Sequence, residues 1–182
     1  MPTPSSAERG AIVVALTFRT LPEIDDALRA RLVDIWTDAT NAGGAIGYVA
    51  PVERESVDAE AFRSFAVGRD LFLVGFQDGE PVAFLVLVDH RFPLKDHARL
   101  LKTVAVDPKH QGRGYGVELL REAERVARTL DGVEMLHLTC RGGLGLEHFY
   151  SKCGYTEVGR IPRMLRVGAD DYRDEIHMAM SL

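Results

Sequence analysis

The stretch Val104–Glu124, which reads VAVDPKHQGRGYGVELLREAE, decides the fold of this chain. Its apolar run at Val104–Val106 stops at Asp107-Pro108, and an amphipathic helical pattern follows Gly116. Between the two, glycines occupy positions 112, 114 and 116. Glycine forms helices poorly and has the most backbone freedom to lose on folding, so three glycines at a helix start indicate a need for bare backbone.

A helix start is a place where bare backbone can bind an anion. Its first N–H groups lack acceptors within the helix and carry partial positive charge. The glycines remove the Cβ atoms that would keep phosphate oxygens away, and Arg113 could add a positive charge. A tight strand-to-helix turn that binds nothing explains the glycines equally well. The spacing excludes a Walker A loop, which needs a Lys after its last Gly, and a dinucleotide loop, because position 117 is Val.

The rest of the chain predicts one α/β domain. Its 182 residues are enough for a full hydrophobic core, with residues 1–10 as a flexible N-terminal tail and 11–182 as the folded part. Along the folded part, short apolar runs that are typical of strands alternate with segments whose apolar residues have helical spacing. Strands are predicted at 12–18, 71–76, 82–88, 98–106, 133–139, 155–161 and 174–180, and helices at 22–39, 57–67, 117–130 and 144–152.

Composition argues against several classes of partner. The net charge is −5 and no basic stripe occurs, which argues against nucleic-acid binding. The longest apolar run, Val82–Val88, is too short to span a bilayer, and the N-terminal ten residues lack the apolar run of a signal peptide. Cys140 and Cys153 have no metal-ligand spacing, so we predict no metal site and a cytoplasmic location.

Two motifs resemble those of the GNAT superfamily of N-acetyltransferases. Gln111, Gly114 and Gly116 match the family's acetyl-CoA loop, Gln/Arg-x-x-Gly-x-Gly/Ala. The segment LEHFYSKCGY at 146–155 resembles its Leu/Phe-Tyr-x-x-x-Gly-Phe/Tyr element. The resemblance covers nearly the whole chain and implies a mixed, mostly antiparallel seven-stranded sheet flanked by helices. GGAIGYVAP at 43–51 and GRIPRML at 159–165 are similar to the tabtoxin-resistance-type branch.

The resemblance implies acetyl-CoA as cosubstrate. Its pyrophosphate would rest on the N–H groups of the glycine loop, and the preceding strand would bond the pantetheine arm through main chain. A bulge in that strand would aim one N–H at the thioester carbonyl. The implied cofactor-binding residues are Val104, Ala105, Val106, Gln111, Gly112, Arg113, Gly114, Tyr115, Gly116 and Val117.

The resemblance also assigns the catalytic acid. Tyr150 occupies the family's usual general-acid position, and a phenol with a pKa of about 10 can give its proton to the departing thiolate. We therefore expect an alkaline fall in kcat as the phenol ionises. Asp89, His90 and Glu53 are candidates for the base. The asparagine common in the family seven residues before the tyrosine is Gly143 here.

The implied function is acetyl transfer to a primary amine of a small molecule, such as an antibiotic, a toxin or an amino acid, by direct attack in a ternary complex. The loop NAGGAIGYVAP at 41–51 would cover the amine, and the negative chain weakly favours a cationic acceptor. Two alternatives stay open: a non-catalytic acyl-CoA-binding sensor and an unrelated phosphate-loop protein. No nucleic acid or membrane partner is expected, and self-association into a homodimer is left open.

Overall fold

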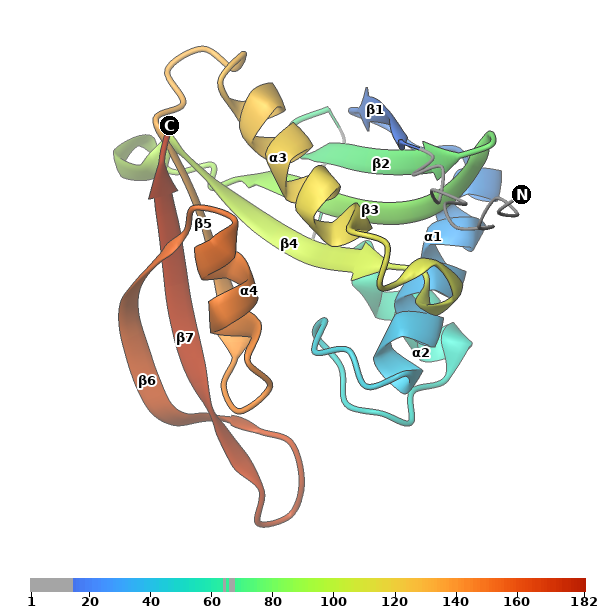
Figure 1. Cartoon of the computed structure of the whole chain (residues 1–182), viewed down its shortest axis with the longest axis vertical. Helices are drawn as coiled ribbons and strands as arrows, with labels where there is room; N and C mark the ends of the chain where they lie inside the picture. The colour runs from blue at the N-terminus through green and yellow to red at the C-terminus, as the bar shows by residue number, and fades with distance from the viewer. Residues whose placement is uncertain (1–14, 64, 66–67) are drawn as a thin grey trace, which may run out of the picture.

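The computed structural model describes residues 15–63, 65 and 68–182, in which seven strands form one sheet with helices on both faces (Figure 1). The predicted tail at 1–10, and the start of the first predicted strand, lie outside these residues. The strands are β1 (Thr17–Leu21), β2 (Leu71–Gln77), β3 (Glu80–Asp89), β4 (Ala98–Val106), β5 (Met135–Arg141), β6 (Thr156–Arg166) and β7 (Tyr172–Ser181). The helices are α1 (Asp26–Asn41), α2 (Arg54–Ala61), α3 (Tyr115–Ala127) and α4 (Leu146–Lys152), with short 3₁₀ turns η1 (Pro93–Lys95) and η2 (Pro108–His110).

The strand order is β1-β2-β3-β4-β5-β7-β6, and every neighbouring pair except β4 and β5 is antiparallel. The parallel pair is short, because only Ala98–Leu100 of β4 face Met135–His137 of β5. Beyond these residues the two strands diverge, as Figure 1 shows. The mixed, mostly antiparallel seven-stranded sheet predicted from the sequence is therefore confirmed. Near its centre, β4 and β5 are paired at one end only and separate toward the other.

Strand β4 carries a bulge close to the point of divergence. Phe84 of β3 pairs with Ala105, whereas Val86 pairs with Lys102, so β4 has one residue more than β3 over this stretch. Thr103 has φ of +56°, which is rare for a β-branched residue. A bulge of this kind bends the strand and leaves the extra residue outside the ladder.

Two hydrophobic clusters cover the sheet. One lies between the strands and α3 and α4, and it includes Leu119, Leu138 and Met178. The other packs α1 and α2 against β2–β4 around Trp36 and Phe84, whose rings meet edge to face. Because α1 and α2 cover only one half of the sheet, no helix of the described residues covers β5 and β7 on that face. The open face lies beside the divergence of β4 and β5.

Three predicted elements were misplaced. Helix α1 starts at Asp26 rather than 22, because the Asp25 side chain accepts a hydrogen bond from the Leu28 N–H at 2.7 Å and caps it there. Helix α2 spans 54–61 rather than 57–67. The helical spacing of Phe62 and Phe65 has another origin, since both rings pack on Phe72. The first strand is Thr17–Leu21 and shares only two residues with the predicted 12–18.

Candidate active site

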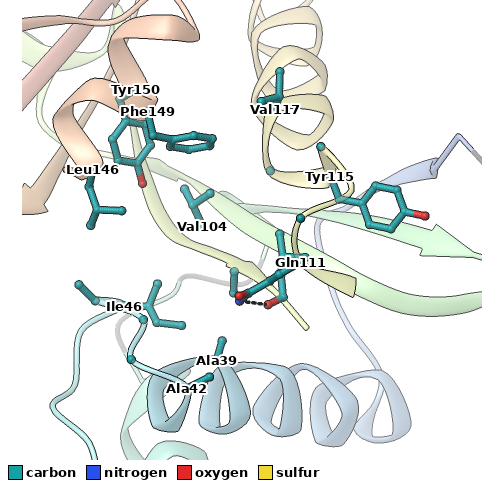
Figure 2. Close-up of a pocket in the computed structure, with 18 residues that line it drawn as sticks. Ala39, Ala42, Ile46, Val104, Gln111, Tyr115, Val117, Leu146, Phe149 and Tyr150 are labelled. Carbon is teal, nitrogen blue, oxygen red and sulfur yellow. Dashed lines mark hydrogen bonds between the residues drawn. The ribbon is translucent and has the colours of Figure 1, made fainter. Parts of the chain in front are cut away.

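A cavity of about 600 Å³ opens where β4 and β5 diverge (Figure 2). Four segments far apart in sequence contribute to it: the end of α1 with the loop that follows, the end of β4, the glycine loop with the start of α3, and α4. Its lining is Ala39, Ala42, Gly43, Gly44, Ala45, Ile46, Val104, Ala105, Val106, Gln111, Gly112, Gly114, Tyr115, Gly116, Val117, Leu146, Phe149 and Tyr150.

The glycine loop begins with a buried carboxylate. Asp107 is 1% exposed, and its side chain accepts bonds from the Lys109 N–H at 2.9 Å and from Arg31 of α1. Burial alone would raise the pKa of Asp107, but these hydrogen bonds outweigh burial and lower it. Arg31 also donates to the Pro81 carbonyl. The start of the loop is thus held by α1, which is itself bonded to the start of β3.

Two of the three glycines hold a left-handed backbone over open space. Gly112 has φ of +77° and Gly114 has φ of +85°, and no atom lies within 4 Å of a Cβ built on either. Gly114 is the N-cap of α3, and its carbonyl accepts from Val117 and Glu118. A helix of thirteen residues therefore presents its positive end to the cavity with no side chain in front of it.

The third glycine allows two helices to approach each other. A Cβ on Gly116 would lie 3.2 Å from Cζ of Phe149 in α4. Phe149 in turn meets the Tyr150 ring edge to face at 5.2 Å. The interpretation that all three glycines clear space for an anion therefore fits Gly112 and Gly114, whereas Gly116 leaves room for Phe149.

The other predicted cofactor-binding residues lie as follows. The Gln111 side chain donates to the Val106 carbonyl at 3.1 Å and so ties the loop to the end of β4 (Figure 2). The Tyr115 ring is buried, points away from the cavity, and donates through its hydroxyl to Gln77 at 2.9 Å. Ala105 is buried, whereas Val104 is partly exposed and points into the cavity. Arg113 is exposed and does not line the cavity.

Tyr150 is 8% exposed, and its hydroxyl points into the cavity (Figure 2). Burial, with smaller contributions from Cys140 and Cys153, raises the pKa of Tyr150 above its ordinary value of about 10. The phenol therefore keeps its proton throughout the neutral range. Burial also raises the pKa of Cys140 to about 11 and that of Cys153, and both thiols are free.

None of the three predicted bases is among the residues that line the cavity. Asp89 accepts bonds from the Arg91 N–H and from Arg69, and these bonds lower its pKa. His90 contacts His137. Glu53 is the residue before α2. Asp89 and His90 lie at the end of β3 and Glu53 lies before α2, positions that the sequence placed near the acceptor. The cavity instead lies where β4 diverges from β5.

Sequence reasoning missed several cavity residues. Leu146 and Phe149 share one face of α4 with Tyr150, so their i, i+3, i+4 spacing could have identified them. No sequence pattern marked Ala39 or Ala42 as cavity residues. Among the described residues, no cluster of three His, Cys, Asp or Glu side chains could hold a metal. None of the helices in this part of the chain has the length and hydropathy to cross a membrane.

Comparisons with known proteins identify the family. Residues 28–155 match the model of the Acetyltransferase (GNAT) family. Ribosomal-protein-alanine N-acetyltransferase from Brucella melitensis aligns over 92% of this chain and 100% of its own, at 23% identity and a TM-score of 0.73. The Salmonella typhimurium protein yncA, solved with its cofactor acetyl-CoA, aligns over 92% of this chain and 94% of its own, at 22% identity and a TM-score of 0.66. At these identities, the two structures show that the fold is shared.

A shorter match is to the tRNA uridine(34) acetyltransferase of Methanocaldococcus jannaschii, which is 43% identical over 49 residues. This match spans 27% of the chain and only 9% of that protein, so it concerns a small part of a much longer sequence. The family model, in contrast, covers most of the chain, from α1 to the end of α4, and includes the glycine loop and Tyr150. The chain therefore belongs to the GNAT family of acetyltransferases.

Proposed function

We propose that this acetyltransferase moves an acetyl group from acetyl-CoA to a primary amine of a small molecule, by direct attack in a ternary complex. The observation that carries the proposal is the cavity itself. Three features line this one cavity: a helix N-terminus with no side chain in front of it, a bulged strand, part of which has no pairing partner on β3, and a protonated tyrosine.

The residues present fit the phosphate end of coenzyme A. Side chains at positions 112 and 114 would project into the space in front of α3, where an anion would lie, and both positions are glycine. The positive end of the helix dipole attracts a phosphate group, and backbone N–H groups can bond its oxygens. We assign pyrophosphate binding to the loop from Gln111 to Val117.

The diverging strand fits the pantetheine arm. Neither Thr103 nor Val104 has a register partner on β3, and β5 pairs with β4 only as far as Leu100. The main chain of Val104–Val106 is thus positioned to add an extended ligand as a strand would be added. An N–H at the bulge would donate to the thioester oxygen and stabilise the negative charge that develops there.

Tyr150 would act as the general acid. Acetyl-CoA supplies the acetyl group as a thioester: the amine nitrogen forms a bond to the carbonyl carbon, the carbon–sulfur bond breaks, and the nitrogen loses a proton. Tyr150 gives its proton to the departing sulfur and regains one from solvent. Because no predicted base lines the cavity, we propose that water carries the amine proton away.

The test is thiol release from acetyl-CoA across classes of amine, with mass spectrometry of the acceptor. We expect release that needs both protein and amine, and an acceptor heavier by one acetyl group. Tight binding of acetyl-CoA without release for any amine would favour the sensor, and the absence of binding would contradict the cofactor assignment. We also propose a cytoplasmic location, which the two free thiols support.

A further inference from the structure

We propose that Arg141 binds an anionic group of the acceptor, so that the preferred acceptor is an amine that also carries a carboxylate, as an amino acid does. This inference rests on the proposed function, because it names the acceptor class of the same site. It starts from the last residue of β5, on the open face of the sheet beside the cavity.

Alternation along β5 places Arg141 on that face. Leu136, Leu138 and Cys140 point into the cluster beneath α3 and α4, so His137, Thr139 and Arg141 point the opposite way. This is the side on which α1, α2 and the loop between them lie. The Arg141 side chain spans the gap to that loop, where Nη2 donates to the Tyr48 carbonyl at 2.8 Å.

The contact with Tyr48 places the guanidinium beside the cavity. Ile46, two residues earlier in the same loop, lines the cavity, and its carbonyl accepts from Nε1 of Trp36 at 2.5 Å. The loop is therefore held from α1 on one side and from β5 on the other. Arg141 does not itself line the cavity, and an acceptor that extends from the cavity along this loop toward β5 would reach it.

Arg141 lacks a counter-charge in the described part of the chain. Its Nε is buried without a hydrogen-bond partner, and no carboxylate lies within 4.0 Å of the side chain. Glu175 is its register partner on β7 but forms no ion pair with it. Burial and the nearby positive charge of Arg173 lower the pKa of Arg141. A partly buried cation without an anion is costly, and a bound anion would offset that cost.

The face carries two further basic residues, Lys102 and Arg173, and the carboxylate of Glu175 opposite Arg141. Lys102 of β4 is exposed and shares a face with its register partner Val86, which belongs to the cluster under α1. Arg173 lies close to Gly143 and pairs with Asp171 at 2.9 Å. The positive charges of Lys102 and Arg141 favour an anion on this face, against the opposing charge of Glu175 and a net charge of −5 for the whole chain. Guanidinium groups bind carboxylates through two parallel bonds, which fixes orientation as well as position.

The experiment compares the twenty standard L-amino acids with their carboxamides in the thiol-release assay, for wild type, Arg141→Met, Arg141→Lys and Arg128→Met. The carboxamide keeps the amine and the side chain and removes only the negative charge. Methionine keeps most of the length of the Arg141 side chain without its charge. Lysine keeps the charge without the planar guanidinium that can form two parallel hydrogen bonds. Arg128 is the exposed C-cap residue of α3, pairs with Glu124, and serves as the matched control.

We expect kcat/KM for the best amino acid to exceed that for its carboxamide by at least about tenfold in wild type and Arg128→Met. In Arg141→Met the two values should agree within about twofold, while Arg141→Lys should keep part of the preference. Melting temperature and acetyl-CoA affinity establish that each variant is folded. Faster acetylation of carboxamides or of cationic amines by wild type, or a preference that survives in Arg141→Met, would overturn the inference while leaving the proposed function intact.

If no amine releases thiol, the proposed function fails, and calorimetry with the same amino acids in the presence of coenzyme A decides the anion site by itself. Binding that weakens at least about tenfold in Arg141→Met but not in Arg128→Met supports the site. Equal binding by all four proteins, or no binding of any amino acid, would contradict it.

Discussion

The Nε2 atoms of His90 and His137 lie 2.6 Å apart, with their rings stacked at a centroid distance of 4.9 Å. His90 follows β3, and His137 is paired with Leu100 where β4 and β5 still run together. The contact therefore bridges the sheet just before it opens. One nitrogen must donate and the other accept, so this bond cannot form when both rings are protonated.

This contact predicts a loss of stability in mild acid. Burial lowers the pKa of both rings, and the charge of Lys95 lowers both further. Arg99 also lowers the pKa of His90, and His177 lowers that of His137. Asp89 acts in the opposite direction and raises the pKa of His90. Because the folded pKa values lie below the ordinary value of about 6.5, the unfolded chain binds more protons below that pH. The stabilising contribution is present above about pH 6.5 and is lost as pH falls through the folded pKa values.

Urea unfolding between about pH 8 and pH 5 measures this effect. The free energy of unfolding of His137→Gln should fall less steeply below pH 6.5 than that of wild type. His148→Gln, at an exposed position, should keep the wild-type slope. Identical slopes for wild type and His137→Gln would show that the pair does not control acid stability.

Tyr150→Phe tests the general acid. The ring and its contact with Phe149 remain while the proton donor is lost, so kcat should fall by about 10² and acetyl-CoA affinity should stay unchanged. A thiolate can leave without assistance, so some activity should remain. Steady-state kinetics and calorimetry provide the two measurements. Full kcat in a folded Tyr150→Phe protein would reduce Tyr150 to a packing residue.

Tyr155→Phe is the matched control. The Tyr155 ring lies 6.0 Å from that of Tyr150, but its buried hydroxyl has no hydrogen-bond partner in the described part of the chain. Removing an unsatisfied buried hydroxyl should leave kcat unchanged and raise the free energy of unfolding by about 1 kcal/mol. A fall in kcat equal to that of Tyr150→Phe would show that packing, and not proton donation, limits both variants.

The alkaline behaviour differs from the sequence-based expectation. Burial raises the pKa of both Tyr150 and Tyr155 above about 10, so the fall in kcat moves to higher pH and kcat should stay level up to about pH 10. The folded state binds these protons more tightly than the unfolded chain, so stability is complete below about pH 10 and declines above it. Measured unfolding and kcat between about pH 7 and pH 11 test both statements. A decline in kcat centred near pH 9 would assign the acid to another group.

Gly44→Ala tests the loop between α1 and α2. An added Cβ would lie 2.6 Å from the Ala39 carbonyl oxygen, so the loop must shift. Because this loop includes Tyr48 and faces the open side of β5, we expect the acceptor KM to rise more than the acetyl-CoA KM. Gly159→Ala in β6, where a Cβ has open space and φ is not positive, is the control for a general effect of substitution. Equal changes in both KM values would argue against an acceptor role.

Local sequence signals predicted much of the fold. The bounds of β4 agree to the residue, and the β2–β3 hairpin follows from its Asp78-Gly79 turn. Strand β6 was predicted to end at Ile161, whereas it continues past Pro162 to Arg166. As the edge strand of the sheet, β6 accommodates the proline within a register shift between Ile161 and Leu165.

The site could be predicted only where a motif marked it. Tyr150 and the glycine loop lie in such motifs, and both line the cavity. The contact of Arg141 with Tyr48, across 93 residues, carries no local signal. It depends on how far β4 and β5 diverge, which is set by the bulge at Thr103 and by packing on both faces of the sheet.

Calorimetric titration of acetyl-CoA into wild type, Gly114→Val and Gly132→Val tests the central claim most directly. Both glycines have positive φ with open space at the Cβ position, so both substitutions strain the backbone alike. Of these two glycines, only Gly114 lies in front of α3 in the cavity. We predict that affinity falls at least about tenfold in Gly114→Val, or roughly 1.4 kcal/mol, and is unchanged in Gly132→Val. Wild-type affinity in a folded Gly114→Val protein would contradict the assignment of the loop to acetyl-CoA.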